Sequence, residues 1–190
     1  MPVTLAKPDQ MTIEEFLAFY EAQPDGKKWE LIEGVVIVSP SPTDWHQRIV
    51  LNITGALDAA KLKVDAPWTA LLGIGTQVPV SPSSLPQPDA FVIEGGLRGS
   101  HVTDDALILF EVLSKSNTKA DQAWRLRVYA SVPNCQHYVT ISTATAEITR
   151  YDRTGDWSAT TITGLDAELS LHAINVSIPL RQIYRWTPVV

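Results

Sequence analysis

The hydrophobic positions of residues 13–20 repeat at helical spacing and predict a short amphipathic helix that ends near Glu21. Thr12 and Glu15 stand three residues apart at its start, which is the spacing of a capping box. Two runs rich in β-forming residues follow, at 29–32 and 35–38, around the pair Glu33-Gly34. They predict a tight hairpin. Glu30 lies inside the first run, where composition alone favours a solvent-facing side chain.

A second amphipathic helix is predicted after a Pro/Ser loop, with Thr43 or Asp44 as its cap. Its apolar face consists of Ile49, Val50, Ile53, Leu57 and Ala60. Extending this face backwards by one turn reaches His46, near the start of the helix. Two interpretations follow: a partly buried histidine with a hydrogen-bond partner, or a side chain at the rim of an active site.

Two apolar strands between residues 88 and 113 each carry one carboxylate. Asp89 opens the first strand, and Glu111 interrupts the apolar run of the second. Burying a carboxylate in such a run costs free energy unless a cationic group pairs with it. Carboxylates at matching ends of neighbouring strands can share a divalent metal such as Mg²⁺, which takes oxygen ligands.

The rest of the chain predicts a helix over 119–130, a strand over 136–142, a hairpin over 146–163 and a short last helix capped by Ser177. Ala123, Leu126 and Ala130 form the expected apolar face of the 119–130 helix. Asp121 and Arg125, four residues apart on it, are expected to form an exposed ion pair. This order of elements predicts one α/β domain over residues 1–190, with a mixed central β-sheet flanked by helices and preceded by a helix and a hairpin.

Composition narrows the functional classes. The chain has 15 Lys and Arg against 21 Asp and Glu, a net charge of −6, which argues against broad coating of nucleic acid but allows a local basic patch. The single Cys135 cannot form an internal disulfide, which fits a cytoplasmic location. No apolar run approaches the length of a membrane span, and no signal-peptide pattern opens the chain.

The order and spacing of several short motifs resemble the Uma2 family of bacterial endonucleases. The motifs are Trp29-Glu30-Leu31-Ile32-Glu33-Gly34, Ser39-Pro40, His46, Pro88-Asp89, Glu111-Val112-Leu113-Ser114 and Asp121…Arg125…Tyr129-Ala130. The resemblance covers roughly residues 12–184. It implies the PD-(D/E)XK restriction-endonuclease-like fold and DNA as the substrate.

The resemblance also implies roles for single residues. Asp89 and Glu111 take the positions of the metal-binding carboxylates, and the backbone carbonyl of Val112 completes the coordination of Mg²⁺ or Mn²⁺. The metal would activate a water and stabilise charge on the scissile phosphate. Glu30 and His46 match further positions of the family pattern and are placed at the site.

One departure from the family pattern affects the expected chemistry. The family usually carries a lysine four residues after Asp121, and this chain has Arg125. Arginine keeps the charge and can grip a phosphate, but it cannot act as a general base. Lys115 and Lys119 lie close in sequence and are alternative cations, although plain solvated lysines are the simpler interpretation.

Three functional hypotheses therefore stand. The first is a metal-dependent DNA endonuclease, which we expect to be a homodimer because two strands are to be cut. The second is a catalytically inactive member of the fold that binds nucleic acid or protein. The third is purely structural, with Asp89 capping a turn and Glu111 paired with Arg125 or Lys119.

Overall fold

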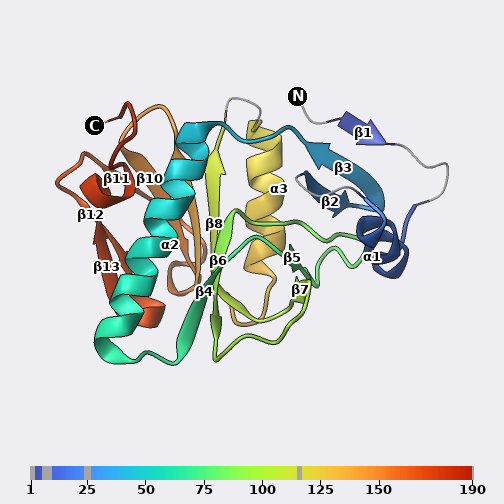
Figure 1. Cartoon of the computed structure of the whole chain (residues 1–190), viewed down its shortest axis with the longest axis horizontal. Coiled ribbons are helices and arrows are strands. Elements are labelled where there is room, and N and C mark those ends of the chain that lie inside the picture. The colour runs from blue at the N-terminus through green and yellow to red at the C-terminus, as the bar shows by residue number, and fades with distance from the viewer. Residues whose placement is uncertain (1–2, 6–9, 24–26, 115–116, 190) are drawn as a thin grey trace.

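A computed structural model describes residues 3–5, 10–23, 27–114 and 117–189. Its centre is a six-stranded mixed sheet, next to which α2 and α3 run (Figure 1). The order across this sheet is β11 (Ala159–Thr163), β10 (Glu147–Asp152), β9 (His137–Ser142), β8 (Ala106–Leu113), β6 (Ala90–Glu94) and β4 (Trp68–Leu72). The β8–β9 pair is parallel and the other four pairs are antiparallel. The predicted α/β class and mixed sheet are confirmed.

Four helices are present in the described residues: α1 (Ile13–Glu21), α2 (Asp44–Val64), α3 (Lys119–Ala130) and α4 (Leu180–Ile183). The 3₁₀ turns η1 (Arg153–Gly155) and η2 (His172–Ile174) follow β10 and β12. Short strands form two further pairs, parallel β5 (Gly75–Thr76) with β7 (Val102–Thr103), and antiparallel β12 (Glu168–Leu171) with β13 (Val176–Pro179). None of these helices combines the length and apolar character that a membrane span requires.

The predicted N-terminal helix and hairpin form a separate layer at the right of Figure 1. Both halves of the capping box are present: the Thr12 N–H donates to Glu15 Oε2 at 2.9 Å, and the Glu15 N–H donates to Thr12 Oγ1 at 3.2 Å. Strands β2 (Lys28–Ile32) and β3 (Val35–Ser39) pair as predicted, and β1 (Val3–Leu5) extends them to a three-stranded sheet. Glu33 and Gly34 both have positive φ, as a two-residue hairpin turn requires.

Strand alternation divides the core between the two faces of the central sheet. Val92 and Phe110 pack with α2 in one hydrophobic cluster, whereas Phe91 and Leu109 pack with α3 in the other. Successive side chains of a strand point to opposite faces. Glu111 follows Leu109 by two residues, so this register directs its side chain to the α3 face.

Several local predictions were wrong. Ser177 does not cap the last helix: residues 176–179 form strand β13, so this helix begins at Leu180 after Pro179. The buried face of α3 consists of Arg125, Val128 and Tyr129, while Ala123 is exposed. The helix is rotated from the predicted orientation because partners in the fold bury Arg125, which hydrophobicity alone assigns to the surface.

Candidate active site

The β6–β8 register brings the two predicted metal carboxylates together. Ala90 pairs with Phe110, so Asp89 stands opposite Glu111 at the start of β6. The Asp89 N–H donates to the Phe110 carbonyl at 3.0 Å, and Asp89 Oδ2 accepts from the Val112 N–H at 2.8 Å. Both carboxylates therefore belong to one small region of the sheet.

Gly73 allows the backbone to pass close by just before Asp89. A Cβ at Gly73 would lie 2.2 Å from the Pro88 carbonyl oxygen, which no side chain permits. The Gly73 N–H in turn donates to the Asp89 carbonyl at 3.3 Å. Glycine at this position therefore lets the backbone approach the segment that carries Asp89.

Glu111 is buried against α3. Its Oε1 accepts from Arg125 Nη1 at 2.8 Å and from the Tyr129 hydroxyl at 2.9 Å. Burial raises the pKa of Glu111 to about 7, against the opposing effect of the Arg125 and Lys28 charges. The Glu111–Arg125 pair is one that the structural hypothesis anticipated.

Glu30 is also buried, at 1 % exposed, so the prediction of a solvent-facing side chain was wrong. Arg125 holds both of its oxygens: Nη2 lies 3.0 Å from Oε2, and Nη1 lies 3.1 Å from Oε1. The Gln87 N–H donates to the same Oε1 at 2.8 Å. Burial would raise the pKa of Glu30, but the charges of Arg125 and Lys28 lower it below its ordinary value.

Arg125 is consequently the centre of a buried network. Besides Glu30 and Glu111, its guanidinium contacts Asp121 Oδ1 at 3.3 Å and the Tyr129 hydroxyl at 3.2 Å. The i,i+4 pair with Asp121 exists, but the expected exposure of Arg125 was wrong, because only 9 % of its side chain reaches solvent. Its donors are committed to protein carboxylates.

Lys28 is the site residue that sequence reasoning missed. Its Nζ lies 2.9 Å from Asp89 Oδ1 and 3.9 Å from Glu111 Oε2, with 24 % of its side chain exposed. Burial lowers its pKa, but Glu111, Asp89 and Glu30 together raise it well above the ordinary value. A sequence signal existed: Lys28 precedes Glu30 by two residues, so the two share one face of β2.

His46 reaches the same cluster from the first turn of α2. Its Nε2 lies 3.1 Å from Asp89 Oδ2. His46 is thus a partly buried histidine whose hydrogen-bond partner is one of the two predicted metal ligands. Burial raises the pKa of Asp89, but Lys28 and His46 outweigh it and hold the pKa well below its usual range. Because an ionised carboxylate only accepts, His46 Nε2 carries the hydrogen of this bond.

The donor set fits a hard divalent cation. Among the described residues, no three His, Cys, Asp or Glu side chains are arranged to hold a metal, so such a site relies on two carboxylates and a backbone carbonyl. Asp89 Oδ1 and Glu111 Oε2 both face the Lys28 ammonium, a cation between two acids. The Val112 carbonyl faces the same edge of β8 as its N–H, which bonds Asp89. These three oxygens are the kind that Mg²⁺ prefers.

Of the two alternative lysines, Lys119 makes no contact with this cluster. Lys119 is the exposed first residue of α3 and forms no ion pair with any described residue. Lys115 lies outside the described residues.

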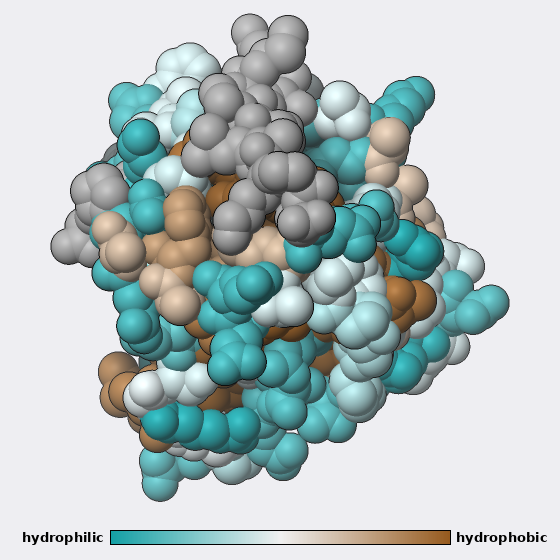
Figure 2. All heavy atoms as spheres, turned by 90° about the vertical axis from the view of Figure 1, so that its right-hand side faces the viewer, coloured by the Kyte–Doolittle hydropathy of each residue, from teal (hydrophilic) through white to brown (hydrophobic). Residues whose placement is uncertain are grey.

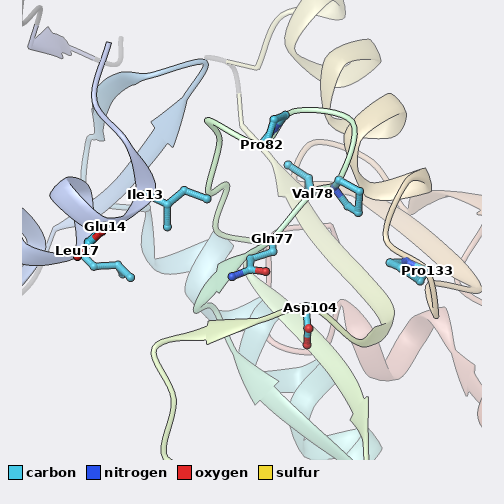
Figure 3. A pocket seen from close by; sticks show the side chains of 9 residues that line it. Ile13, Glu14, Leu17, Gln77, Val78, Pro82, Asp104 and Pro133 are labelled. Atoms are coloured by element: carbon cyan, nitrogen blue, oxygen red, sulfur yellow. The ribbon is translucent and has the colours of Figure 1, made fainter. Parts of the chain in front are cut away.

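A cavity of about 630 Å³ lies elsewhere, between α1 and the loop after β5 (Figure 3). Ile13 and Leu17 line it on one side, and Val78, Pro82 and Pro133 on the other. None of the predicted site residues lines it. On the face shown in Figure 2, hydrophilic side chains predominate and hydrophobic ones show mainly in the gaps between them. The polar cluster, rather than this apolar cavity, holds the groups suited to hydrolytic chemistry.

Comparison with known proteins agrees with the fold and the motifs. The Uma2 family profile, described as "Putative restriction endonuclease", matches residues 13–181. The chain belongs to the Uma2 family. The Uma2 match contains Lys28 and the five residues predicted from the sequence to be catalytic, which are Glu30, His46, Asp89, Glu111 and Arg125. Residues 182–190 lie beyond it.

A solved structure gives the same assignment of fold. It is described as a "putative nuclease belonging to DUF820" from Anabaena variabilis, with a TM-score of 0.74 and 16 % sequence identity. The alignment covers 93 % of this chain and 98 % of that one. No protein with curated annotation matches the chain.

Proposed function

We propose that this Uma2 protein is a Mg²⁺- or Mn²⁺-dependent endonuclease that hydrolyses phosphodiester bonds of DNA. One observation carries the proposal: Asp89 Oδ1 and Glu111 Oε2 both lie within 3.9 Å of the same cation, the Lys28 ammonium. A divalent ion held by these oxygens and the Val112 carbonyl would activate water and stabilise charge on the phosphate.

Lys28 would act as a positive charge rather than as a base. Its raised pKa keeps it protonated near neutral pH, so it cannot take a proton from water. As the cation of the cluster with the more exposed side chain, it can neutralise the extra charge that a phosphate gains during attack by water. Arg125 holds Glu30 and Glu111 in place instead.

His46 would orient the proposed metal ligand Asp89 rather than take a proton from water. The His46 Nε2–H donates to Asp89 Oδ2 at 3.1 Å and so fixes the position of this carboxylate oxygen. Nδ1 is buried and has no hydrogen-bond partner among the described residues. In hydrolysis the water oxygen bonds phosphorus, one P–O ester bond breaks, and the leaving oxygen takes up a proton. The proton that the attacking water loses would pass to solvent, because the buried His46 Nδ1 is not accessible to that water.

A second function is supported by the paired state of the cluster. Three carboxylates, Glu30, Asp89 and Glu111, already face two cations, Lys28 and Arg125. Carboxylates whose charges are already neutralised by protein cations are also expected in a member of the fold that binds nucleic acid or protein but does not catalyse hydrolysis.

Calorimetric titration with Mg²⁺ and Mn²⁺, followed by a nuclease assay, tests the proposal. The proteins are wild type, Asp89→Asn, Glu111→Gln and the control Asp166→Asn, whose carboxylate is exposed and pairs with Arg181. The substrates are plasmid and single-stranded DNA, with and without a chelator. The proposal requires that metal binding and cleavage disappear in the first two variants and persist in the control.

Metal binding without cleavage would favour the non-catalytic function, and absence of both would overturn the proposed metal site. Light scattering on the same samples tests the proposed homodimer, which would place two sites against two strands.

A further inference from the structure

Two arginines of this chain have side chains with neither an acidic partner nor a hydrogen bond to another described residue. Arg98, Arg125, Arg127, Arg150 and Arg181 pair with carboxylates, and Arg153 donates to backbone carbonyls. The side chains of Arg48 and Arg185 form neither kind of contact with the described residues. Both lie against one aromatic ring, that of Trp186: the Arg48 Cζ is 5.4 Å from the ring centroid and the Arg185 Cζ is 4.0 Å from it. We call these three residues the Trp186 surface.

The ring that both cations contact is open to solvent. Trp186 is 69 % exposed, an unusual state for a tryptophan. Its segment is nevertheless held in place: Asn52 Nδ2, on α2, donates to the carbonyls of Ile183 and Arg185 at 2.9 and 2.8 Å. The exposed ring is therefore presented on a fixed backbone.

The nearest acid on the same helix does not neutralise the surface. Asp44 stands four residues before Arg48 on α2, but its Oδ1 accepts from the Trp45 N–H at 2.9 Å and it forms no ion pair with described residues. Trp45, three residues before Arg48 and so on the same side of the helix, is 47 % exposed. The result is a local basic and aromatic patch on a chain whose net charge is −6.

We propose that the Trp186 surface binds a nucleic-acid strand, with an unpaired base stacked on Trp186 and the flanking phosphates held by Arg48 and Arg185. Exposed aromatic rings beside cations are the usual means of holding single-stranded nucleic acid. This inference rests on the proposed function for the nature of the partner, and it adds a contact outside the catalytic cluster. Arg185 and Trp186 also lie beyond the residues that the Uma2 profile matches.

The position of the surface suits a strand that also enters the active site. His46 and Arg48 are two residues apart near the start of α2, so their side chains leave the helix on roughly opposite sides. A helix is about 10–12 Å wide with its side chains. Successive phosphates of one strand of a B-DNA duplex advance about 3.4 Å along the helix axis, and an unstacked single strand advances further, so it crosses that width in about three nucleotides or fewer. The Trp186 surface would thus grip the substrate a few nucleotides from the scissile bond.

Fluorescence anisotropy with a labelled single-stranded oligonucleotide and a blunt duplex tests the inference, in a chelator so that no cleavage occurs. Trp186→Ala should weaken binding of the single strand roughly tenfold, and the blunt duplex much less. Arg48→Gln and Arg185→Gln should each lower the slope of log affinity against log salt by about 0.7. Arg181→Gln, on the neighbouring α4 and paired with Asp166, should change neither.

The outcomes separate this inference from the proposed function. If wild type binds DNA and the Trp186 and arginine variants bind equally well with the same salt slope, the Trp186 surface is overturned and the nuclease proposal stands. An equal loss on duplex and single strand overturns base stacking. If wild type binds neither DNA, either in the chelator or in a second sample with Ca²⁺ in place of the chelator, both proposals fail. Thermal melts of Arg48→Lys and Arg48→Gln identify any loss that comes from unfolding.

Discussion

The Lys28 ammonium lies 2.9 Å from Asp89 Oδ1 and links strand β2 of the N-terminal hairpin to the start of β6. It is also within 3.9 Å of Glu111, so one side chain touches both proposed metal ligands. A cation of the protein therefore stands where a divalent ion would bind, and the two must share or exchange the same oxygens.

Replacing Lys28 by Met should strengthen metal binding and weaken cleavage. Two unit charges about 4 Å apart interact by roughly 4 kcal/mol at an effective dielectric of 20. Loss of the ammonium should therefore raise Mg²⁺ affinity about tenfold or more, measured by calorimetry. Cleavage should fall by roughly 10²-fold, because a positive charge beside the phosphate is lost. Lys119→Met, at an exposed position, is the control. Unchanged affinity in Lys28→Met would show that metal and ammonium do not compete.

Replacing Arg125 by Ala should destabilise the fold strongly. The substitution leaves the buried carboxylates of Glu30 and Glu111 without their main counter-ion, a loss that typically costs about 3–5 kcal/mol. Urea unfolding measures it. Asp121→Asn removes only the partly exposed partner and should cost less than about 1 kcal/mol. Equal costs for the two variants would contradict the central role of Arg125.

Arg125→Lys restores the residue type usual in the family and separates charge from geometry. Lysine keeps the charge but lacks the planar fork that binds both oxygens of Glu30. We expect a stability between those of wild type and Arg125→Ala, by urea unfolding. A Lys variant as unstable as the Ala variant would show that the fork, rather than the charge, holds the site together.

The raised pKa of Glu111 predicts a stability that falls as pH increases. Its pKa is about 7 in the folded protein and about 4.5 without the fold, so the folded state binds more protons between these values. Stability should therefore decrease from about pH 4.5 to 7, by up to about 3 kcal/mol from this group. Asp89 acts in the opposite direction. Its lowered pKa stabilises the fold near neutral pH, and this stabilisation is lost as the pH falls into the acidic range.

Glu111→Gln isolates this effect, because glutamine stays neutral. The free energy of unfolding of the variant minus that of wild type, measured with urea, should be more favourable to the variant at pH 8 than at pH 5. The same stability difference at both pH values would exclude Glu111 as the titrating group.

His137 should matter for stability but not for metal binding. Its Nδ1 lies 2.6 Å from Asp152 Oδ1, and its Nε2 accepts from the Ala173 N–H at 3.1 Å, so both nitrogens are used by the fold. His137→Ala should cost about 1–3 kcal/mol, since buried partners lose their hydrogen bonds. In calorimetry, His137→Ala should bind Mg²⁺ with the same affinity as wild type. A loss of metal binding in a folded variant would connect this second cluster to the site.

Local sequence patterns determined the outline of this protein. Strand periodicity, the Thr12–Glu15 capping box and the Glu33-Gly34 turn each depend on residues close together in the chain, so the helices and hairpins could be predicted with few errors. The pairing of Asp89 with Glu111 was also accessible, since each stands at an end of a recognisable strand.

Only the tertiary structure decided which charges meet. Glu30 and Arg125 are 95 residues apart, and Lys28 and Asp89 are 61 apart, so no local pattern reports their contact. The same long-range pairing makes burial of Arg125 and Glu30 tolerable and rotates α3 away from its apparent apolar face. Burial of a charge depends on the partner that compensates it, and that partner comes from a distant element of the fold.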